Sequence, residues 1–333
     1  MSDGVVLRPG RDDDASGFIA LIGAAWAEYP GCVMDVDGEM PEMRALATYF
    51  ARAGGALWAA ERAGRIVGMI GARPLREDGA WEICRMYADA GLRGAGLAQH
   101  LLSTAERHAQ AEGAARLVLW TDTRFTRAHG FYEKHSYVRQ GSIRILDDLS
   151  KSLEFRYAKP ARGLVVEALD AAAAASAERR LSEILVACVE DGASVSFLPP
   201  LAPETARAFW KAASSDVALG KRLVLAAWLD GVMVGTVQLH LDMPQNQPHR
   251  ADLAKLLVHP DARRRGIARA LMQRAEQAAR GIGRRLLVLD TASDAAARLY
   301  RELGWTEVGT IPGFALWPDG SPCATTFFWK ALA

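Results

Sequence analysis

The sequence predicts an α/β protein (in finer terms α+β) made of two tandem copies of one domain. The chain has 333 residues, about twice the length of a typical domain. The same order of strand, glycine-containing turn, helix and strand occurs twice, and matched positions are offset by roughly 170 residues, about one domain length. We therefore predict one domain over residues 1–160 and a second over residues 161–333.

The composition excludes several classes of function. Half of the residues are apolar and 24% are charged, as in ordinary soluble globular proteins. The 40 Lys and Arg residues nearly balance the 39 Asp and Glu residues, so any anion site must be local. The four cysteines form no CxxC pair, which disfavours a metal site or a disulfide framework. With no signal-peptide pattern and no apolar run of spanning length, we expect a cytoplasmic protein.

Upstream of the glycine turn, each copy is predicted to contain a β-hairpin with a glycine just before its second strand. The hairpin strands are expected at residues 57–61 and 65–70 in the first copy, and at 223–229 and 232–239 in the second. A longer strand follows in each copy, at 82–88 and at 252–258. Each longer strand begins near an acidic residue, Glu82 or Asp252, eleven positions before an arginine.

A glycine-containing turn joins each of these strands to an amphipathic helix. The turns are Arg93–Ala98 and Arg263–Ala268, and the helices start at Leu97 and Ile267 with apolar residues at helical spacing. Gly113 and Gly281 are plausible helix stops. The sequence thus predicts the same strand–turn–helix unit twice.

A short apolar strand follows the helix in each copy, at 117–120 and at 286–289. A tyrosine then stands ten residues after an aspartate: Tyr132 after Asp122, and Tyr300 after Asp290. Between the copies, the proline and glycine in residues 158–163 predict a domain boundary. A new strand at 164–167 and a helix from residue 171 are expected after it.

The glycine turns are candidate pyrophosphate sites. The first amides of a helix have no internal partners, the helix dipole adds partial positive charge, and small residues let a phosphate approach the backbone. The candidate binding residues are Arg93, Gly94, Ala95, Gly96, Leu97 and Ala98 in the first copy, and Arg263, Arg264, Arg265, Gly266, Ile267 and Ala268 in the second. The alternatives are a solvated arginine face and a dinucleotide fingerprint, although neither copy has the GxGxxG spacing.

Both halves resemble GNAT N-acetyltransferases, whose hallmark is a strand ending in a Gln/Arg-x-x-Gly-x-Gly/Ala turn. The second half is the closer match, through Lys255–Ala268, Leu287–Thr291 and Leu299–Trp305, and is similar to the tabtoxin-resistance branch of that family. The resemblance implies a mixed, mostly antiparallel sheet flanked by helices in each domain. It also implies a splay between two central strands, acetyl-CoA as co-substrate, and no metal.

The resemblance also implies roles for single residues. Tyr300 and Tyr132 would be general acids, the alternative being tyrosines that close a core. Asp252 or Glu82 would be the general base, although the shorter Asp252 favours a water relay or no role. Backbone N–H groups near Leu257 and Val258, or near Tyr87 and Ala88, would meet the oxyanion.

Departures from the family pattern favour the second domain as the enzyme. Where the family often has an asparagine, seven residues before the tyrosine, the second copy has Ser293 and the first has Phe125. Ser293 can donate a hydrogen bond to a ligand, whereas Phe125 cannot. We therefore expect the first domain to be degenerate or to have a different acceptor.

The expected activity is transfer of an acetyl group from acetyl-CoA to a primary amine of a small molecule by direct attack. The alternative is a non-catalytic acyl-CoA-binding or scaffold protein. Nucleic-acid binding through the three consecutive arginines is disfavoured by the net charge of +1. We expect a monomer or homodimer with neither a nucleic-acid nor a membrane partner.

Overall fold

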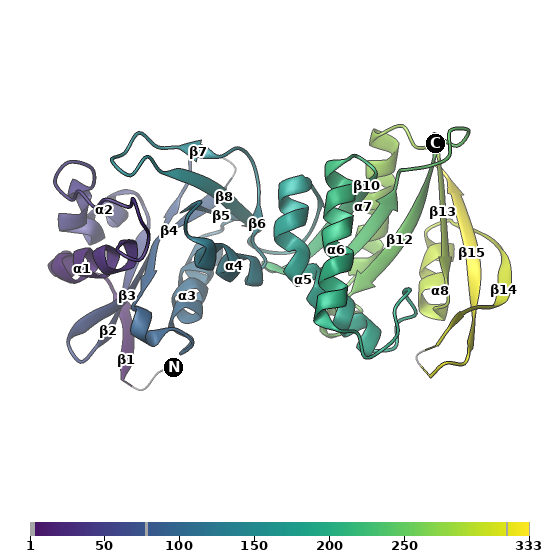
Figure 1. Ribbon diagram of the computed structural model, residues 1–333, viewed down its shortest axis with the longest axis horizontal. Coiled ribbons are helices and arrows are strands. Elements are labelled where there is room, and N and C mark those ends of the chain that lie inside the picture. The colour runs from purple at the N-terminus through teal and green to yellow at the C-terminus, as the bar shows by residue number, and fades with distance from the viewer. Residues whose placement is uncertain (1–3, 77–78, 318, 333) are drawn as a thin grey trace. The chain divides into compact units, whose positions relative to one another are not determined.

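The computed structural model describes residues 4–76, 79–317 and 319–332 (Figure 1). The chain divides into two compact units. The first unit comprises Met1–Tyr132 and Arg139–Arg162, and the second comprises Glu133–Val138 and Gly163–Ala333. Each unit holds one mixed sheet flanked by helices, which confirms the predicted fold class.

The first unit is built on a sheet with the strand order β1-β2-β3-β4-β5-β8-β6, and β7 pairs with β8. Its β4 and β5 are parallel, whereas β1–β2, β2–β3, β3–β4 and β5–β8 are antiparallel. The elements are β1 (Val5–Pro9), α1 (Ala15–Trp26), α2 (Leu46–Arg52), β2 (Ala56–Arg62), β3 (Arg65–Pro74), β4 (Ala80–Ala88), α3 (Leu97–Ala111), β5 (Arg116–Asp122), α4 (Thr126–Lys134), β6 (Val138–Arg139), β7 (Arg144–Ile145) and β8 (Leu153–Pro160).

The second unit repeats this plan with the strand order β14-β15-β13-β12-β11-β10-β9. The pair β12–β13 is parallel and the other pairs are antiparallel. The elements are β9 (Leu164–Leu169), α5 (Ala171–Glu190), α6 (Pro203–Ala218), β10 (Arg222–Leu229), β11 (Val232–His240), β12 (Arg250–Val258), α7 (Ile267–Gly281), β13 (Leu286–Thr291), α8 (Asp294–Glu302), β14 (Thr306–Leu316) and β15 (Pro322–Ala331).

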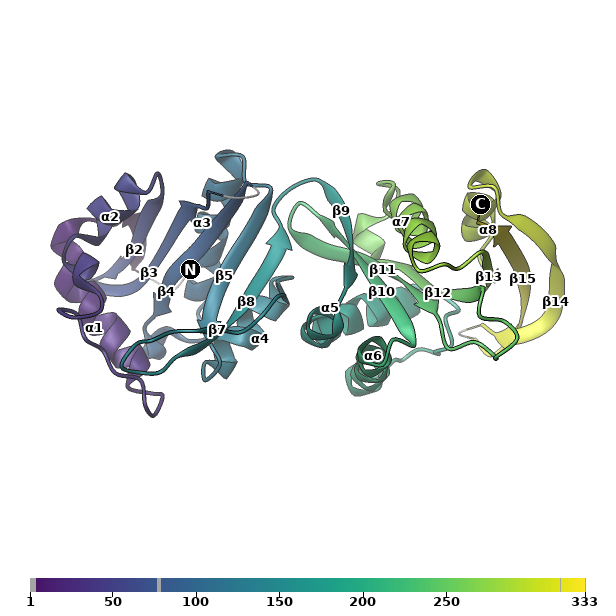
Figure 2. The same ribbon diagram turned by 90° about the horizontal axis from the view of Figure 1, so that it is seen from above.

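Helices cover both faces of each sheet because successive side chains of a strand point to opposite faces. In the second unit, Leu225 and Ala227 of β10 pack with α7 and α8, whereas Val224 and Ala226 pack with α5 and α6. Figure 2 shows α7 on one side of this sheet and α5 and α6 on the other. The second unit therefore has two apolar cores, one on each face of its sheet.

The parallel pair at the centre of each sheet stays together for only three residues. In the second unit, Arg250–Asp252 pair with Leu286–Val288, and the rest of β12 has no register with β13. In the first unit, Ala80–Glu82 pair with Arg116–Val118. The two central strands of each sheet thus diverge into the splay that the family resemblance implies.

A β-bulge interrupts the longer strand of each copy just beyond the start of the splay. Lys255 of β12 has φ +54° and Arg85 of β4 has φ +52°, and the register with the neighbouring strand shifts at both places. A bulge adds one unpaired residue and re-aims the side chains after it. These two bulges occupy equivalent positions of the repeat and were not predicted.

The predicted hairpins, strands and helices are confirmed, with small differences at their ends. Gly281 is the last residue of α7 and not a stop beyond it; the chain turns at Gly283, where φ is +78°. The strand β8 runs through Pro160, so the break between the copies falls at residues 161–163. Proline is tolerated at a strand end because it needs no ladder donor there.

Candidate functional site

A cavity of about 890 Å³ opens in the second unit, in the splay between β12 and β13. Its walls are the loop after α5, the part of β12 around and beyond the bulge, the glycine turn with the start of α7, the end of β13, and parts of α8 and β14. The cavity therefore connects the predicted pyrophosphate turn to the predicted catalytic tyrosine. Both belong to elements that follow the diverging strands in the chain.

The glycine turn of the second unit has the geometry of an anion cradle. Gly266 is the N-cap of α7 and has φ +77°, in the left-handed region that favours glycine. An added Cβ at Gly266 would meet no protein atom within 4 Å, so it would project into the open space at the start of α7. Gly266, Ile267 and Ala268 all line the cavity, and the first amides of α7 have no partner within the helix.

The three consecutive arginines of this turn differ in their positions. Arg263 and Arg264 line the cavity, whereas Arg265 is exposed and is not part of the lining. Arg263 forms an ion pair with Asp191 at the end of α5. Arg264 has φ +61°. The structure thus brings two of the three predicted arginines to the cavity.

Tyr300 lies on α8 with its ring packed against Phe328 and Trp305, at centroid distances of 5.6 and 6.0 Å. The residue is 4% exposed and lines the cavity. Burial raises the pKa of the Tyr300 phenol, and the nearby Asp290 carboxylate raises it further. The phenol is therefore protonated across the neutral pH range.

Three further predicted binding residues also line the cavity. Leu257 and Val258 lie on β12 beyond the bulge, where the strand no longer pairs with β13. Ser293 is the N-cap of α8, and its Oγ accepts a hydrogen bond of 3.3 Å from the Ala296 amide. This capping role explains a serine at that position, and the side chain still reaches the cavity wall.

Asp252, one of the two predicted bases, is not among the residues that line this cavity. Its carboxylate pairs with Arg250, with Oδ1 3.2 Å from Nε. Asp252 borders a smaller hollow of about 250 Å³, together with His240 and Arg222. The residue is still paired with β13, so it lies before the point where the strands open.

The glycine turn of the first unit has the same backbone form as that of the second, and an added Cβ at Gly94 or Gly96 would also meet no protein atom within 4 Å. Gly94 and Gly96 have φ +80° and +82°. The left-handed glycine conformation of the turn is therefore also present in the first unit, in the segment made of Arg93, Gly94, Ala95, Gly96, Leu97 and Ala98. Arg93 forms an ion pair with Glu28. Ala88 ends β4 next to the turn.

The predicted catalytic residues of the first unit have internal partners. The Tyr132 hydroxyl contacts the Met86 sulfur at 3.6 Å, and the residue is buried. Burial raises the pKa of this phenol too. Glu82 is buried and pairs with Arg73, 2.6 Å away. Tyr132 and Glu82 are therefore each engaged with another side chain of the first unit.

Two charged residues of the second-unit cavity were missed as candidates from the sequence. Lys255 stands at the bulge of β12, and Asp290 stands at the end of β13; both line the cavity. Asp290 stands at the end of β13 as Asp122 stands at the end of β5 in the first copy. The recurrence of this aspartate in both copies could have identified Asp290 from the sequence. The bulge that places Lys255 in the cavity has no sequence pattern that predicts it.

A profile of the Acetyltransferase (GNAT) family matches the chain twice, over residues 19–137 and 189–305. The chain belongs to the GNAT acetyltransferase family. It is an N-acetyltransferase with two GNAT domains in tandem. Each match spans the hairpin, the glycine turn and the tyrosine of one copy, so the repeat is a repeat of the whole family domain.

This GNAT acetyltransferase is 31% identical over 148 residues to an uncharacterized N-acetyltransferase in the hisH–hisA intergenic region of Azospirillum brasilense, covering 39% of the chain and 82% of that relative. It is 28% identical over 137 residues to a mycothiol acetyltransferase of Streptomyces avermitilis, covering 40% of the chain and 43% of that relative.

Similar solved structures cover about one domain of the chain. A ribosomal-protein-alanine N-acetyltransferase from Brucella melitensis has a TM-score of 0.42 and 22% identity, over 50% of this chain and 99% of that one. A phosphinothricin acetyltransferase from Sinorhizobium meliloti in complex with AcCoA has a TM-score of 0.43 and 18% identity, over 51% of this chain and 89% of that one.

Within the described part of the chain, no group of three or more His, Cys, Asp or Glu side chains is placed to hold a metal ion. Among the same residues, no helix combines the length and apolarity needed to cross a bilayer.

Proposed function

We propose that the second unit transfers the acetyl group of acetyl-CoA to the primary amine of a small molecule, with Tyr300 as the general acid. One observation carries the proposal: a single cavity joins the anion cradle at Gly266 to the buried phenol of Tyr300. The uncharged amine nitrogen would form a bond to the acetyl carbon while the carbon–sulfur bond breaks. Tyr300 would protonate the leaving sulfur, and the proton lost by the nitrogen would restore the phenol. The products would be an amide and CoA.

The residues of the cavity fit acetyl-CoA. The open space at Gly266 and the unpaired first amides of α7 suit a pyrophosphate, and Arg263 and Arg264 add cationic donors. Beyond the bulge, alternate N–H groups of β12 point away from β11 into the splay, where they can bind the pantetheine arm and the thioester oxygen. When bound, acetyl-CoA supplies an acetyl group activated as a thioester.

Tyr300 is suited to donating a proton to the leaving sulfur. A thiol has a pKa of about 8.5 in water, below that of an ordinary phenol, so burial that raised only the phenol pKa would oppose the transfer. The same desolvation raises the pKa of a buried thiol, because it disfavours any anion. Burial therefore raises the pKa of both groups and does not by itself oppose the proton transfer.

The first unit is proposed to retain the family fold without turnover. The hydroxyl of Tyr132 contacts a methionine sulfur, and Tyr87 of the same unit accepts a hydrogen bond of 3.0 Å from the Trp26 indole. Trp26 and Tyr87 also pack against the core under α1 and α2. Tyr87 occupies the repeat position of Leu257, so an aromatic pair stands where the second unit has its cavity wall.

The test is a comparison of Tyr300→Phe with the matched variant Tyr132→Phe. With an amine panel and a thiol-release assay, Tyr300→Phe should lower kcat by about 10²-fold, the lower end for a general acid, because a thiolate is a tolerable leaving group. Its Kd for acetyl-CoA, measured by calorimetry, should not change. Tyr132→Phe should retain the full rate.

Three results would each contradict part of the proposal. Full activity of Tyr300→Phe would remove the tyrosine from the mechanism while leaving acetyl transfer intact. Failure of the unmodified protein to bind acetyl-CoA at micromolar concentration would overturn the assignment of the cavity. An equal loss of rate in both variants would show that the first unit also turns over.

A further inference from the structure

The cavity of the second unit carries two opposite charges away from its glycine turn. Lys255 lies on β12, three residues after its last pairing with β13, and Asp290 lies on β13, two residues after its last pairing with β12. They therefore stand on opposite sides of the splay, and both line the cavity.

Lys255 is held at the bulge with polar and aromatic neighbours but no acid. Its Nζ donates to Ser196 Oγ at 3.1 Å and lies 5.6 Å from the centroid of the Phe209 ring. Among the described residues, no carboxylate oxygen lies within 4.0 Å of this Nζ. Burial and the nearby Arg222 lower the pKa of Lys255, and Asp290 acts in the opposite direction. An anion bound at Lys255 would offset this cost of burial.

Asp290 is likewise without a cation in the described part of the chain. Its Oδ2 accepts a hydrogen bond of 3.0 Å from Thr325 Oγ1 of β15, which fixes the carboxylate toward the splay. Its charge acts on Tyr300 and on Lys255. A carboxylate beside the catalytic phenol is well placed to hold an ammonium group before the reaction.

The first unit has the same two charges at the equivalent positions and neutralises both. Arg85, at the bulge of β4, pairs with Glu42 at 2.6 Å. Asp122, at the end of β5, pairs with Arg124 at 2.6 Å. The second copy has Ala292 where the first has Arg124. The two open charges are thus a specific difference between the copies and not a general feature of the fold.

Among the described residues, the other charged side chains of the cavity either form ion pairs or belong to the glycine turn or to the start of a helix. Arg263 pairs with Asp191, and Arg269 pairs with Glu302. Arg264 belongs to the glycine turn. Asp294 is the first residue of α8, where the helix N-terminus stabilises an acid.

We propose that the acceptor is a small amine that also carries an acidic group, with Asp290 binding its ammonium and Lys255 binding its anion. The assignment rests on the function proposed above and names the chemical class of its substrate. A neutral amine would leave the half-buried Lys255 beside an uncharged group, and a diamine would place two positive charges together. We therefore expect a neutral amine and a diamine to bind more weakly to Lys255 and Asp290 than an amine that carries an acidic group.

The experiment compares α- and ω-amino acids with their carboxamides, which lack the negative charge but keep the amine. Acetyl transfer is followed by thiol release, and binding to the CoA-saturated protein is followed by calorimetry. The unmodified protein should prefer the free acid over its carboxamide by at least tenfold in kcat/KM and in affinity. Lys255→Gln should abolish this preference by weakening the acid only, and Lys255→Arg should retain it.

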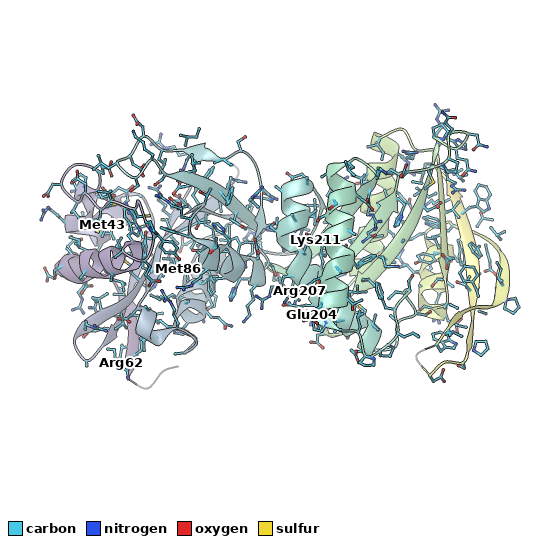
Figure 3. All side chains as sticks on the ribbon, viewed as in Figure 1. Met43, Arg62, Met86, Glu204, Arg207 and Lys211 are labelled. Carbon is cyan, nitrogen blue, oxygen red and sulfur yellow. The ribbon has the colours of Figure 1, made fainter. Side chains whose placement is uncertain are left out.

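Lys211→Met is the matched control, because Lys211 lies on the exposed surface of α6 (Figure 3) and outside the cavity lining. It should leave the preference unchanged. All variants should bind acetyl-CoA as the unmodified protein does, which separates a specific effect from misfolding.

The outcomes distinguish the acceptor class from the proposed activity. Transfer to acids and carboxamides at equal rates, or equal losses on both in Lys255→Gln, would overturn the acceptor class while the acetyl transfer stands. Acid binding that depends on Lys255 without any transfer would support the acceptor class and overturn the proposed activity. Absence of both binding and transfer for every acid in the panel would overturn both.

Discussion

At the scale of single residues, the features that lie in contiguous sequence could be predicted. The turn at Gly266 and the tyrosine of α8 were found because their geometry depends on a few consecutive residues. The choice between carboxylates could not be predicted in this way. Asp252 lies on the closed part of the strand pair and Asp290 on the open part, and this depends on where two distant strands separate.

A pair of glycines allows a test of the pyrophosphate cradle. Gly266 and Gly283 have φ +77° and +78°, and an added Cβ would meet no atom within 4 Å at either position. Alanine at each should therefore cost about 1 kcal/mol in backbone strain. Only Gly266 lines the cavity, so Gly266→Ala should weaken acetyl-CoA binding at least tenfold and Gly283→Ala should not.

Calorimetric titration of acetyl-CoA into the two variants checks this prediction, and thermal unfolding checks that both lose similar stability. Equal affinity in Gly266→Ala and the unmodified protein would mean that the turn does not contact the cofactor. Equal weakening in both would mean that strain alone is responsible.

At the scale of elements, each copy has a buried ion pair between its long helix and its last strand. Glu276 of α7 is 6% exposed and accepts from Lys330 of β15 at 2.8 Å and from the Trp305 indole at 3.0 Å. Glu106 of α3 pairs with Lys159 of β8 at 2.9 Å. Burial lowers the pKa of Lys159. The two ion pairs lie at equivalent positions of the repeat. They belong to no catalytic motif, so the sequence motifs do not predict them.

Removal of one partner from the second pair should be costly. Lys330→Met removes the nearer cation of the buried Glu276 carboxylate and leaves the half-exposed Arg280 at 4.0 Å, so it should reduce the free energy of unfolding of the second unit by about 3 kcal/mol. The double variant with Glu276→Leu should recover most of that loss, because no lone charge is left. Hydrogen exchange of the α7 amides reports on this unit separately.

The exposed pair Arg269–Glu302 is the control for this experiment. Its loss in Arg269→Ala should cost less than about 1 kcal/mol, as for other surface pairs. A Lys330→Met variant that is as stable as this control would show that the buried pair contributes little. A double variant no better than the single one would point to lost packing and not to the unpaired charge.

At the scale of the whole molecule, the sequence predicts the duplication. It predicts only in part that the first copy neutralises the two charges that the second copy leaves open. Matching offsets show the repeat because the strands, turn and helix recur in order. Arg124, which neutralises Asp122 two residues earlier, has Ala292 as its counterpart in the second copy. Glu42, which neutralises Arg85, lies in the 3-10 helix Pro41–Ala45, and its pairing joins residues 43 positions apart, so no local sequence pattern predicts it.

The two copies together predict the number of acetyl-CoA sites. We expect one site per chain in a calorimetric titration, because the second unit has the open cavity and the first has its aromatic side chains and charges paired internally. Gly266→Ala should weaken this site, whereas Gly96→Ala in the first unit should leave it unchanged. Two sites per chain would show that the turn of the first unit also binds the cofactor.

The short ladder between β12 and β13 has a consequence for the mechanics of the second unit. Three residue pairs join the strands β9 to β12 to the strands β13 to β15, so the backbone link between these sub-sheets is brief. A molecule lying in the splay touches both sub-sheets and replaces the hydrogen bonds that a longer ladder would have made. Affinity for such a molecule and the stiffness of the sheet are then two measures of the same contacts, so a ligand that binds in the splay should also slow hydrogen exchange of the amides in β12 and β13.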